Sequence, residues 1–568
     1  MPCAPTLSTG RFLSHRRRPI YDCGLGRQEF ATDDVAAETR VSRGQSGGSL
    51  NKGRILWVDD EVDLLRPHTI LLMREGYHVD AVMNGNDALE LLDRESYDLV
   101  LLDEQMPGLR GIEVLSEIRA RGRGLPVVMV TKSETDDTMH EAIGRRADDY
   151  IVKPTSPRQV LSVVTRLLAG PRLRHEQIAK EFTRRFGELR DEIGRAESWT
   201  DWSSLYSELV DWELGLEQAG ESDLREILRS LQSDVRRGFS DLVAREYSDW
   251  THEGGESGPV LSVDVMQRFL QPVISDDSAC MLFVLDCLRL DQWRAMRPLL
   301  EEHFEIEESL YSSILPTATP FSRNAIFSGL FPDELEEARP GWYESGEEEG
   351  YNAFEDELFA AHVKELAGPG IPTHYEKVFN AEQGEDLLNR LPGWLSRPCA
   401  TAIVFAFVDL LTHGRSESRL LWEVARDAAA LRSLTLGWFE RSAALEALRE
   451  AARRGVPVLL TTDHGSVHCN RPAVVYAKRD ATANLRYKFG RDLRVENPSA
   501  VLSASDPDDL RLPSRGYQTN YALCREDYYF VYPTKLREYQ SRYRDSFLHG
   551  GISPEEMILP AVLLTPRG

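Results

Sequence analysis

The sequence contains no apolar run long enough to cross a membrane and no cysteine pair at metal-binding spacing. Its seven cysteines include no Cys-x-x-Cys pair, which excludes a thiolate zinc site and suits a reducing compartment. No stretch approaches the ~18 apolar residues of a membrane span, and the arginines at positions 16–18 precede no apolar core of a secretory signal. We therefore expect a cytoplasmic protein without a membrane span.

Positive charge is also scarce. Aspartate and glutamate number 92 against 67 lysines and arginines, which gives a formal net charge of −25. Such a chain repels phosphates at long range, so direct binding of duplex DNA is not expected, although a small nucleotide held through metal is compatible with this charge. The 568 residues exceed what one hydrophobic core supports and predict three or four units.

The first unit predicted is a disordered tail at residues 1–52. It is rich in Gly, Ser, Thr and Arg and shows no sustained periodicity. A mis-set translation start is the alternative, because the regular pattern begins abruptly at Arg54. From there to about Leu168, strand and helix patterns alternate, which predicts a parallel α/β unit at residues 53–170. The strand-like runs are 55–58, 99–102, 127–130 and 150–152.

Polar residues stand at the carboxyl ends of these runs. Asp59 and Asp60 follow the first run, Asp103 ends another, and Thr131 and Lys153 follow the last two. Because such ends meet at one edge of a parallel sheet, these side chains are expected to lie together. Their order, with Leu-Asp-Glu-Gln-Met-Pro-Gly around Asp103 and Lys-Pro at Lys153, resembles the receiver domain of bacterial response regulators. That domain has a flavodoxin-like fold.

The receiver resemblance implies that Asp103 is phosphorylated by a sensor histidine kinase. A carboxylate that attacks a phosphoryl group needs a divalent cation to offset the charge, and Mg²⁺ suits an oxygen-rich site. The resemblance assigns Mg²⁺ to Asp59, Asp60 and Asp103. It also implies a set of switch residues: Thr131, Tyr150 and Lys153. The alternative is an inert flavodoxin-like domain with an acidic pocket.

Between residues 172 and 245 the apolar period becomes that of helices. Three stripes predict three antiparallel helices, and their aromatic residues are interpreted as core. No helix carries clustered base-reading residues, so the region, 171–258 with a linker at 251–258, is expected to transmit a signal or to dimerise. The stripes are Ile178, Phe182, Phe186, Leu189 and Ile193; Leu205, Leu209, Trp212 and Leu216; and Leu224, Leu228, Leu231, Val235, Phe239 and Leu242.

The last unit, residues 259–568, contains three apolar runs that each end in an aspartate. The runs 281–285, 403–408 and 456–462 are interpreted as buried strands that end at Asp286, Asp409 and Asp463. In an open parallel sheet these carboxylates would converge, and they would repel one another unless cations lay between them. The pattern therefore predicts a metal site in an α/β domain.

Histidines accompany these aspartates. His413 follows Asp409 by four residues, His464 follows Asp463 directly, and His549 stands in a His-Gly-Gly motif near the C-terminus. Any one of these histidines, taken alone, would be interpreted as structural. Together with the aspartates they indicate zinc or manganese rather than calcium.

A hydroxyl candidate lies between these segments, in Pro-Thr-Ala-Thr-Pro. We expect Thr319 to cap a helix that begins at Pro320, where the positive end of the helix favours an anion such as phosphate. Coordination to a dication would make this alcohol a nucleophile. Thr317 is the alternative ligand. For Arg323 and Asn324, one turn on, an exposed helix face is favoured over contact with substrate oxygens.

Five segments together resemble the alkaline phosphatase superfamily and, within it, the PglZ domain, over about residues 275–566. The segments are 286–293, the Pro-Thr-x-Thr motif that ends at Thr319, 409–413, 462–465 and 549–557. The resemblance implies two zinc ions. One is assigned to Asp409, His413 and His549, and the other to Asp286, Asp463, His464 and Thr319. It further implies that Thr319 is the nucleophile and that cyclic and linear oligonucleotides are substrates.

Three other features remain open at this stage. Residues 333–357 hold eleven acidic residues against one basic residue, interpreted as a solvated loop, with a lid or substrate-selecting insert as the alternative. His468 matches no ligand position and is interpreted as structural. Asp291 is expected to pair with Arg289 or to lie at a helix end.

The order of receiver, helical bundle and PglZ domain resembles the PorX-like response regulators, which are linked to type IX protein secretion. We expect a two-component enzyme in which phosphorylation of Asp103 controls homodimerisation and a zinc phosphodiesterase. One alternative is a signalling adaptor that docks a sigma factor or secretion-system protein with little catalysis. A phosphomonoesterase is the other, although monoester sites need extra cationic groups.

Overall fold

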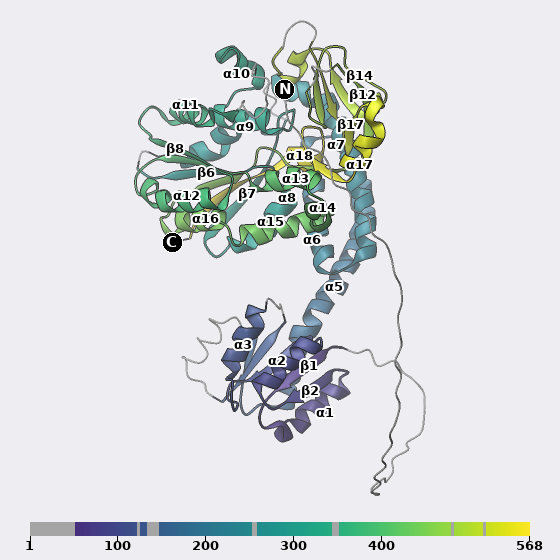
Figure 1. Ribbon diagram of the computed structural model, residues 1–568, viewed down its shortest axis with the longest axis vertical. Helices are drawn as coiled ribbons and strands as arrows, with labels where there is room; N and C mark the ends of the chain where they lie inside the picture. Colours follow the sequence, from purple (N-terminus) through teal and green to yellow (C-terminus); the bar gives the residue numbers. More distant parts are fainter. Residues whose placement is uncertain are drawn as a thin grey trace, which may run out of the picture.

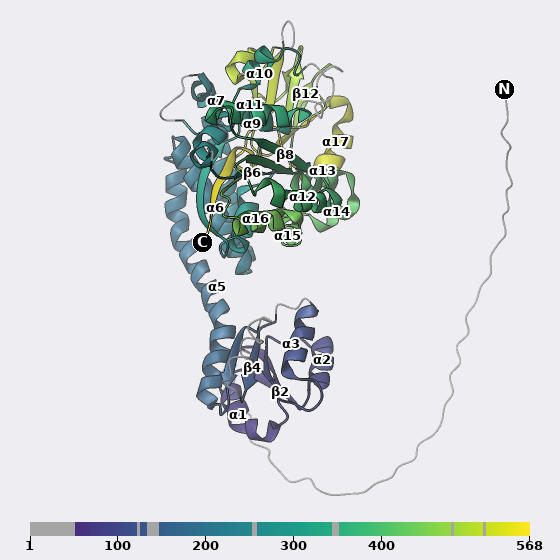
Figure 2. The ribbon, with the colours of Figure 1, turned by 90° about the vertical axis from the view of Figure 1, so that its left-hand side faces the viewer.

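The protein consists of a small N-terminal α/β unit and a larger C-terminal assembly, joined by one long helix (Figures 1 and 2). No helix in the described part of the chain is long and apolar enough to span a membrane. The predicted disordered tail lies outside the described residues except for Lys52. The computed structural model describes residues 52–121, 125–132, 147–252, 258–275, 277–343, 352–478, 482–514 and 519–567.

The N-terminal unit is a five-stranded parallel sheet with strand order β2-β1-β3-β4-β5. This order is that of the flavodoxin-like fold, which confirms the predicted fold class. Strands β1 and β3 are almost wholly buried because helices cover both faces. The elements are β1 (Arg54–Val58), η1 (Val62–Leu65), α1 (Arg66–Arg74), β2 (His78–Val82), α2 (Gly85–Arg94), β3 (Leu99–Asp103), α3 (Gly111–Ala120), β4 (Val127–Thr131) and β5 (Asp149–Val152).

Strand β2 is an element that the hydrophobic pattern did not identify. It lies at the edge of the sheet and pairs only with β1 among the described strands. In its five residues only Val79 is buried. An edge strand that is mostly accessible carries no continuous apolar run, so the sequence signal for it is weak.

Three helices, α5 (Pro157–Ile193), α6 (Trp199–Gln218) and α7 (Ser222–His252), form the middle of the molecule. Each predicted stripe falls on one of them, and its members are buried in a common core or packed against it. Side-chain caps begin two of the helices: Ser156 accepts a hydrogen bond from the backbone of α5, and Ser198 forms a capping box with Asp201. Helix α5 runs without interruption from the N-terminal unit into this bundle.

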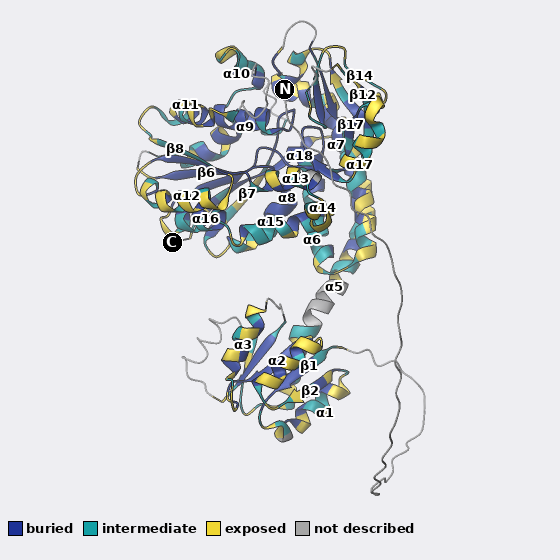
Figure 3. Cartoon of the chain, viewed as in Figure 1, coloured by how far each residue is buried: buried dark blue, intermediate teal, exposed yellow. Residues whose placement is uncertain are grey.

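The bundle packs on the C-terminal assembly, and the two share one hydrophobic core. In Figure 1 the bundle lies along one side of the large sheet, and Figure 3 shows buried residues continuing from its helices into the strands. Polar contacts cross this junction too: the Arg294 guanidinium donates to the Ser207 carbonyl and pairs with Asp211. The N-terminal unit, by contrast, has its own cores.

The large sheet of the C-terminal assembly has the strand order β7-β19-β10-β6-β9-β8. Strands β10, β6, β9 and β8 are parallel, whereas β19 and β7 complete the sheet in antiparallel pairs. These strands are β6 (Cys280–Leu285), β7 (Phe304–Ser312), β8 (Thr373–Val378), β9 (Ala400–Phe405), β10 (Val458–Thr461) and β19 (Ile558–Pro566).

Helices cover both faces of this sheet. Both ribbon views place α9, α10 and α11 on one side and α12, α15 and α16 on the other (Figures 1 and 2). The helices are α8 (Leu290–Met296), α9 (Thr319–Ser328), α10 (Pro332–Ala338), α11 (Glu355–Ala367), α12 (Ala381–Trp394), α13 (Phe407–Glu417), α14 (Arg419–Val424), α15 (Ala428–Phe439), α16 (Ala443–Arg453) and α18 (Pro554–Met557).

An insertion between β10 and β19 forms three small sheets that the sequence did not predict. They are β11 (Val467–Cys469) with β18 (Ser546–Leu548); β12 (Arg471–Tyr476) with β14 (Arg494–Val495) and β17 (Tyr528–Val531); and β13 (Tyr487–Gly490) with β16 (Asn520–Cys524) and β15 (Val501–Ala504). The insertion also contains α17 (Leu536–Tyr543). Pairing of β11 with β18 brings the two ends of the insertion together.

Short helical turns complete the described elements. One is a π-helical turn, η3 (Met266–Leu270). The others are 3-10 turns: η2 (Ser262–Asp264), η4 (Gln271–Val273), η5 (Arg297–Leu299), η7 (Pro498–Ala500), η8 (Pro507–Leu510) and η9 (Pro533–Lys535).

One predicted strand end is wrong. The run 403–408 was interpreted as strand up to Asp409, but β9 ends at Phe405 and the chain enters α13 at Phe407. Asp409 therefore lies in the first turn of a helix, where the positive end of the helix dipole favours its carboxylate. The apolar run continued past the strand because Phe407 and Val408 pack against the core from the helix.

The close approach of α6 to α7 predicts a destabilising substitution. A methyl group at Gly238 of α7 would lie 2.0 Å from the Trp202 ring. We expect Gly238→Ala to lower the free energy of unfolding by about 1–3 kcal/mol, because the ring is held in the bundle core. The lowered midpoint of thermal unfolding, measured by calorimetry, is the readout.

The matched control is Gly187→Ala on α5, where an added methyl group meets nothing within 4 Å. Alanine is the better helix former by roughly 0.5–1 kcal/mol, so this variant should be neutral or slightly stabilised. Equal midpoints for the two variants would contradict the close packing of Trp202 on Gly238.

Candidate functional site

The three predicted aspartates lie at one edge of the large sheet. Asp286 follows β6, Asp463 follows β10, and Asp409 lies just past β9 in α13. These strands are neighbours and run parallel in the order β10-β6-β9. Residues far apart in the sequence therefore converge, as the carboxyl ends of adjacent parallel strands require.

The first predicted ligand group is assembled from two elements. Asp409 and His413 lie four residues apart on one face of α13, and His413 Nε2 is 3.4 Å from Asp409 Oδ1. His549 Nε2 lies 2.9 Å from His413 Nε2 and 3.6 Å from Asp409 Oδ1. Asp409 and His549 are largely buried, whereas the side chain of His413 is 56% exposed and therefore lies at the mouth of the site.

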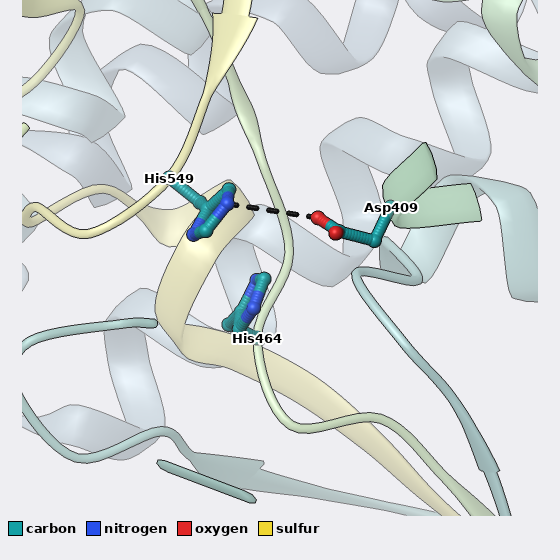
Figure 4. Close-up of side chains that lie close together, drawn as sticks. All are labelled: Asp409, His464 and His549. Atoms are coloured by element: carbon teal, nitrogen blue, oxygen red, sulfur yellow. Dashed lines mark ion pairs between the residues drawn. The ribbon is translucent and has the colours of Figure 1, made fainter. Parts of the chain in front are cut away.

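The second group lies directly beside the first. His464 Nε2 is 3.8 Å from Asp286 Oδ1 and 3.7 Å from Asp463 Oδ2. The imidazole rings of His464 and His549 stack with centroids 4.1 Å apart. Figure 4 shows Asp409, His464 and His549 pointing toward one another from separate segments. The ligand atoms of His464, Asp409 and His549 also lie within 4.8 Å of one another. His464 therefore lies between the two groups.

These residues fit a cation site. Three buried carboxylate oxygens, Asp286 Oδ1, Asp409 Oδ1 and Asp463 Oδ2, accept no hydrogen bond from any residue that the structure describes. Buried acceptors without partners are costly, and bound metal would satisfy them. Burial and the neighbouring carboxylate of Asp463 also raise the pKa of Asp286 to about 7. Positive charge is needed to keep this group ionised.

The two groups differ in their electrostatics. Burial acts to raise the pKa of Asp409, but the His413 imidazole and the nearby His549 outweigh it and hold that pKa below its usual range. Burial, followed by the neighbouring His464, lowers the pKa of His549 well below its usual value. His549 is therefore neutral at physiological pH, the state in which an imidazole binds metal.

The two threonines of the Pro-Thr-Ala-Thr-Pro segment have different surroundings. Thr319 Oγ1 lies 3.0 Å from His464 Nε2, beside the ligand groups. Thr317 Oγ1 donates to the Gly551 carbonyl at 2.8 Å and accepts from the Gly550 amide at 3.0 Å. Thr317 thus holds the loop that follows His549, and this geometry favours Thr319 as the reactive hydroxyl.

The predicted cap of this helix is wrong by one residue. Thr319 is the first residue of α9 and Ala318 is the N-cap, without a side-chain cap. The Thr319 hydroxyl is directed to His464 instead of the helix amides. The following Pro320 has no amide hydrogen to donate, which suits it to the first turn of the helix.

The predicted exposed helix face at Arg323 and Asn324 is also wrong. Both side chains are buried, because α11 packs against α9. Arg323 pairs with Asp286 and Glu355, and its Nη1 lies 3.6 Å from Asp463 Oδ2. Burial opposes the charged form, but these carboxylates outweigh it and hold the pKa of Arg323 above its usual value.

Glu355 is a site residue that sequence reasoning missed. It lies in the acidic segment 333–357 that was interpreted as a solvated loop, yet its side chain is fully buried against Arg323. Tyr375 also donates to it, and Asn352 Nδ2, which is 3.2 Å from the Thr319 carbonyl, donates to it at 2.8 Å. No sequence signal separates Glu355 from its ten acidic neighbours. Residues 344–351 of this segment lie outside the described residues.

The loop that carries His549 is fixed by a buried ion pair between Arg486 and Glu556. Glu556 also accepts from the Gly551 amide and the Ser553 hydroxyl. Gly465, directly after His464, could carry no side chain, because an added Cβ would lie 2.0 Å from the Glu555 carbonyl. The His464 and His549 segments are therefore locked together.

Helix α7 of the bundle contacts the same loop. Arg236 pairs with Glu555, and the Ser240 hydroxyl donates to the Ile552 carbonyl at 3.1 Å. Ser240 also accepts from the Glu526 amide at 3.3 Å. The bundle thus contacts the segment that positions His549.

The N-terminal unit contains a second cluster of acidic groups. Asp59, Asp60 and Asp103 offer oxygens within 4.8 Å of one another. Lys153 Nζ donates to Asp59 at 2.8 Å and to Asp103 at 2.9 Å. Burial raises the pKa of Asp103, and the ammonium group of Lys153 only partly offsets this effect. This oxygen-rich arrangement suits Mg²⁺.

The remaining predicted residues are placed as follows. Thr131 ends β4, and Tyr150, in β5, is 41% exposed. Asp291 pairs with Arg289, as expected, and also with Arg432. His468 lies in β11 and its ring contacts Phe547.

Comparison with known families gives three matches along the chain. Residues 55–165 match the response regulator receiver domain, and residues 172–251 match the PorX response regulator linker domain. Residues 265–564 match the BREX system PglZ alkaline phosphatase-like domain. Domains of the last kind generally use metal ions, and receiver domains bind Mg²⁺.

Two curated relatives each match about a fifth of this chain. The transcriptional regulatory protein ResD of Bacillus subtilis is 41% identical over 118 residues, 21% of this chain and 49% of that protein. The sensory transduction protein RegX3 of Mycobacterium tuberculosis is 40% identical over 116 residues, 20% of this chain and 50% of that protein. The chain thus spans about half the length of these relatives.

Solved structures of receiver domains also match the chain. A Francisella response regulator 1452 receiver domain is 25% identical and covers 21% of this chain and 97% of that one, with a TM-score of 0.20. The receiver domain of NtrX from Brucella abortus is 34% identical and covers 20% and 98%, with a TM-score of 0.20.

The contacts of Thr317 predict how the His549 loop responds to substitution. Thr317→Val would leave the Gly550 amide and the Gly551 carbonyl without these partners inside the protein. We expect a loss of about 1–3 kcal/mol in the free energy of unfolding. Thr317→Ser keeps both hydrogen bonds and is the control. Denaturant unfolding of the two variants measures the difference, and equal stability would contradict this role of Thr317.

Proposed function

This chain belongs to the PglZ alkaline phosphatase-like family and, with its receiver and linker, is a PorX-like response regulator; from this premise we propose that phosphorylation of Asp103 controls a zinc-dependent phosphodiesterase. The proposed units are residues 53–170, 171–258 and 259–568, after a tail at 1–52. A receiver domain implies a sensor kinase as partner. The proposed substrates are cyclic or linear oligonucleotides.

One observation carries this proposal: two adjoining aspartate and histidine groups stand beside a threonine hydroxyl. We assign Asp409, His413 and His549 to one zinc ion, and Asp286, Asp463, His464 and Thr319 to the other. Mixed carboxylate and imidazole donors suit zinc. When bound, the ions would supply positive charge and Lewis acidity at the reacting phosphate.

Residues of the chain itself supply the nucleophile and stabilise the negative charge of the substrate. Thr319 Oγ1 is the proposed nucleophile: its proton passes to solvent and it forms the new bond to phosphorus. The bond from phosphorus to the leaving oxygen breaks, and that oxygen departs with the electron pair and takes up a proton from solvent. Water then cleaves this ester and restores the hydroxyl. Thr319 begins α9, so the amides of that helix's first turn favour the negative charge of the substrate.

The surroundings of Arg323 support a diester over a monoester substrate. A monoester dianion carries one more negative charge than a diester and needs additional cationic groups. Arg323 lies one turn after Thr319, but its guanidinium already pairs with Asp286 and Glu355. It therefore offers little charge to a substrate, and a diester fits better. The diester also suits a chain whose net charge is −25.

Regulation is proposed to pass from the receiver along α5. A phosphoryl group on Asp103 would compete with the carboxylates for Lys153, whose ammonium is held by Asp59 and Asp103. Thr131 and Tyr150 are the proposed switch residues that follow this change. The resulting receiver surface would favour a homodimer. The PorX-type linker also hints at a link to secretion, for which a secretion-system protein or sigma factor is a proposed partner.

Removal of the proposed nucleophile tests the enzyme. We expect Thr319→Ala to reduce hydrolysis of bis(p-nitrophenyl) phosphate by about 10³-fold or more while zinc content stays near two per chain. Thr319→Ser, which keeps a hydroxyl, should retain far more activity. Chelation should abolish the activity of the wild type, and added zinc should restore it. If the wild type, Thr319→Ala and Thr319→Ser all show equally negligible turnover, the proposed enzymatic activity is wrong and a signalling adaptor is favoured.

Phosphorylation of the receiver tests the regulation. Beryllofluoride with Mg²⁺ mimics an acyl phosphate, and we expect it to shift the 64.3 kDa chain to a dimer in analytical ultracentrifugation. Asp103→Asn should stay monomeric under the same conditions. Glu117→Gln, which removes an exposed carboxylate on α3, is the control and should dimerise. A dimer of Asp103→Asn that depends on beryllofluoride would refute this role of Asp103.

A further inference from the structure

A cavity of about 630 Å³ lies between the helical bundle and the C-terminal assembly, apart from the metal-ligand groups. Helices α6 and α7 form one wall, with Tyr206, Arg225 and Arg236 among their residues. The opposite wall includes His468 from β11 and Glu555 from α18. Its volume falls within the range of about 300–1,000 Å³ that is usual for small-molecule sites.

The cavity wall combines basic and acidic side chains. Five arginines and six carboxylates line it. Four of the arginines already have acidic partners: Arg229 pairs with Glu226, Arg236 with Glu555, Arg289 with Asp291, and Arg471 with Asp527. These pairs fix the walls and leave Arg225 as the available cation.

Arg225 has no ion pair with any residue that the structure describes. Its Nε is buried and also lacks a hydrogen-bond partner within the described part of the chain. A buried guanidinium nitrogen without a partner is costly, and an anion is the partner that best relieves it. Arg225 therefore provides an anion-binding group on the α7 wall.

Two other residues that line the cavity each have a buried polar atom without a hydrogen-bond partner among the described residues: Glu555 at Oε2 and His468 at Nε2. Glu555 Oε2 accepts hydrogen bonds only. Burial lowers the pKa of His468 to about 4, so this imidazole is neutral and can donate or accept. An occupant that satisfies this wall therefore carries an anionic group for Arg225 and hydroxyl or amino donors for Glu555.

We propose that this cavity is a second ligand site that binds a nucleoside monophosphate. The phosphate would pair with Arg225, and a ribose hydroxyl or base amino group would donate to Glu555. The choice of a nucleotide rests on the proposed function, because hydrolysis of an oligonucleotide releases nucleotides. The site itself rests on the cavity and its unpartnered groups, which do not depend on catalysis.

The walls connect this site to the metal-ligand groups. Glu555 pairs with Arg236 of α7, and the next residue, Glu556, anchors the loop of His549. On the same side, His468 of β11 pairs in register with Phe547 of β18, two residues before His549. A bound nucleotide that engages Glu555 thus acts on the segment that places His549, and it is expected to alter the turnover of diester substrates.

Calorimetric titration of the zinc-loaded full chain with AMP tests the proposal. AMP can bind at the metal centre as a product, so Asp286→Asn is used to remove that contribution. We expect Asp286→Asn to bind one AMP per chain. In the same background, Arg225→Gln should weaken this binding about tenfold or more, because it removes the charged partner of the phosphate.

Two further variants sharpen the result. Arg237→Gln removes an exposed cation of α7 that pairs with Asp234 and is not a cavity wall residue, so it should bind AMP as its parent does. Ser233→Trp fills the cavity and should abolish binding without changing a charge. An Asp286→Asn protein that binds no AMP, or equal affinities for Arg225→Gln and Arg237→Gln, would overturn the proposal. Hydrolysis of bis(p-nitrophenyl) phosphate by the wild type tests the proposed function independently of AMP binding.

Discussion

Crowding of buried carboxylates at the end of three adjacent strands is the constraint on which the C-terminal assembly depends. The Asp463 carboxylate and burial raise the pKa of Asp286, and the Arg323 guanidinium lies within ion-pair distance of both carboxylates. Arg323 is itself shared with Glu355, so the compensation is incomplete. The packing of α9 against α11, the buried charge of Glu355 and the fixed loop of His549 hold these carboxylates close together.

Local patterns made much of this arrangement predictable. The aspartates end or follow apolar runs, and the parallel order of those strands follows from their burial on both faces, so Asp286 and Asp463 could be placed at a sheet edge from the sequence. The receiver was predictable for the same reason, because Asp59, Asp103 and Lys153 mark the carboxyl ends of β1, β3 and β5. The helical stripes of the bundle were equally clear, since a 3.6-residue period persists over many turns.

Long-range contacts account for what the sequence did not reveal. Arg323 has the pattern of an exposed helix residue, and only the packing of α11 over α9 buries it. Glu355 is indistinguishable from the acidic residues around it until Arg323 is placed beside it. The small sheets after His464 consist of strands of two to six residues, too short for a distinct period, and their pairing is set by closure of the insertion. Asp409 was misplaced because an apolar run does not show where a strand becomes a helix.

Helix α5 connects the receiver and the bundle as one continuous helix. Its 37 residues span roughly 55 Å at 1.5 Å per residue. A continuous helix can transmit rotation as well as translation, because each residue turns the chain by roughly 100° about the helix axis. The rotational position of the receiver relative to the bundle therefore depends on the number of residues in α5, and an insertion or deletion in this helix would change it.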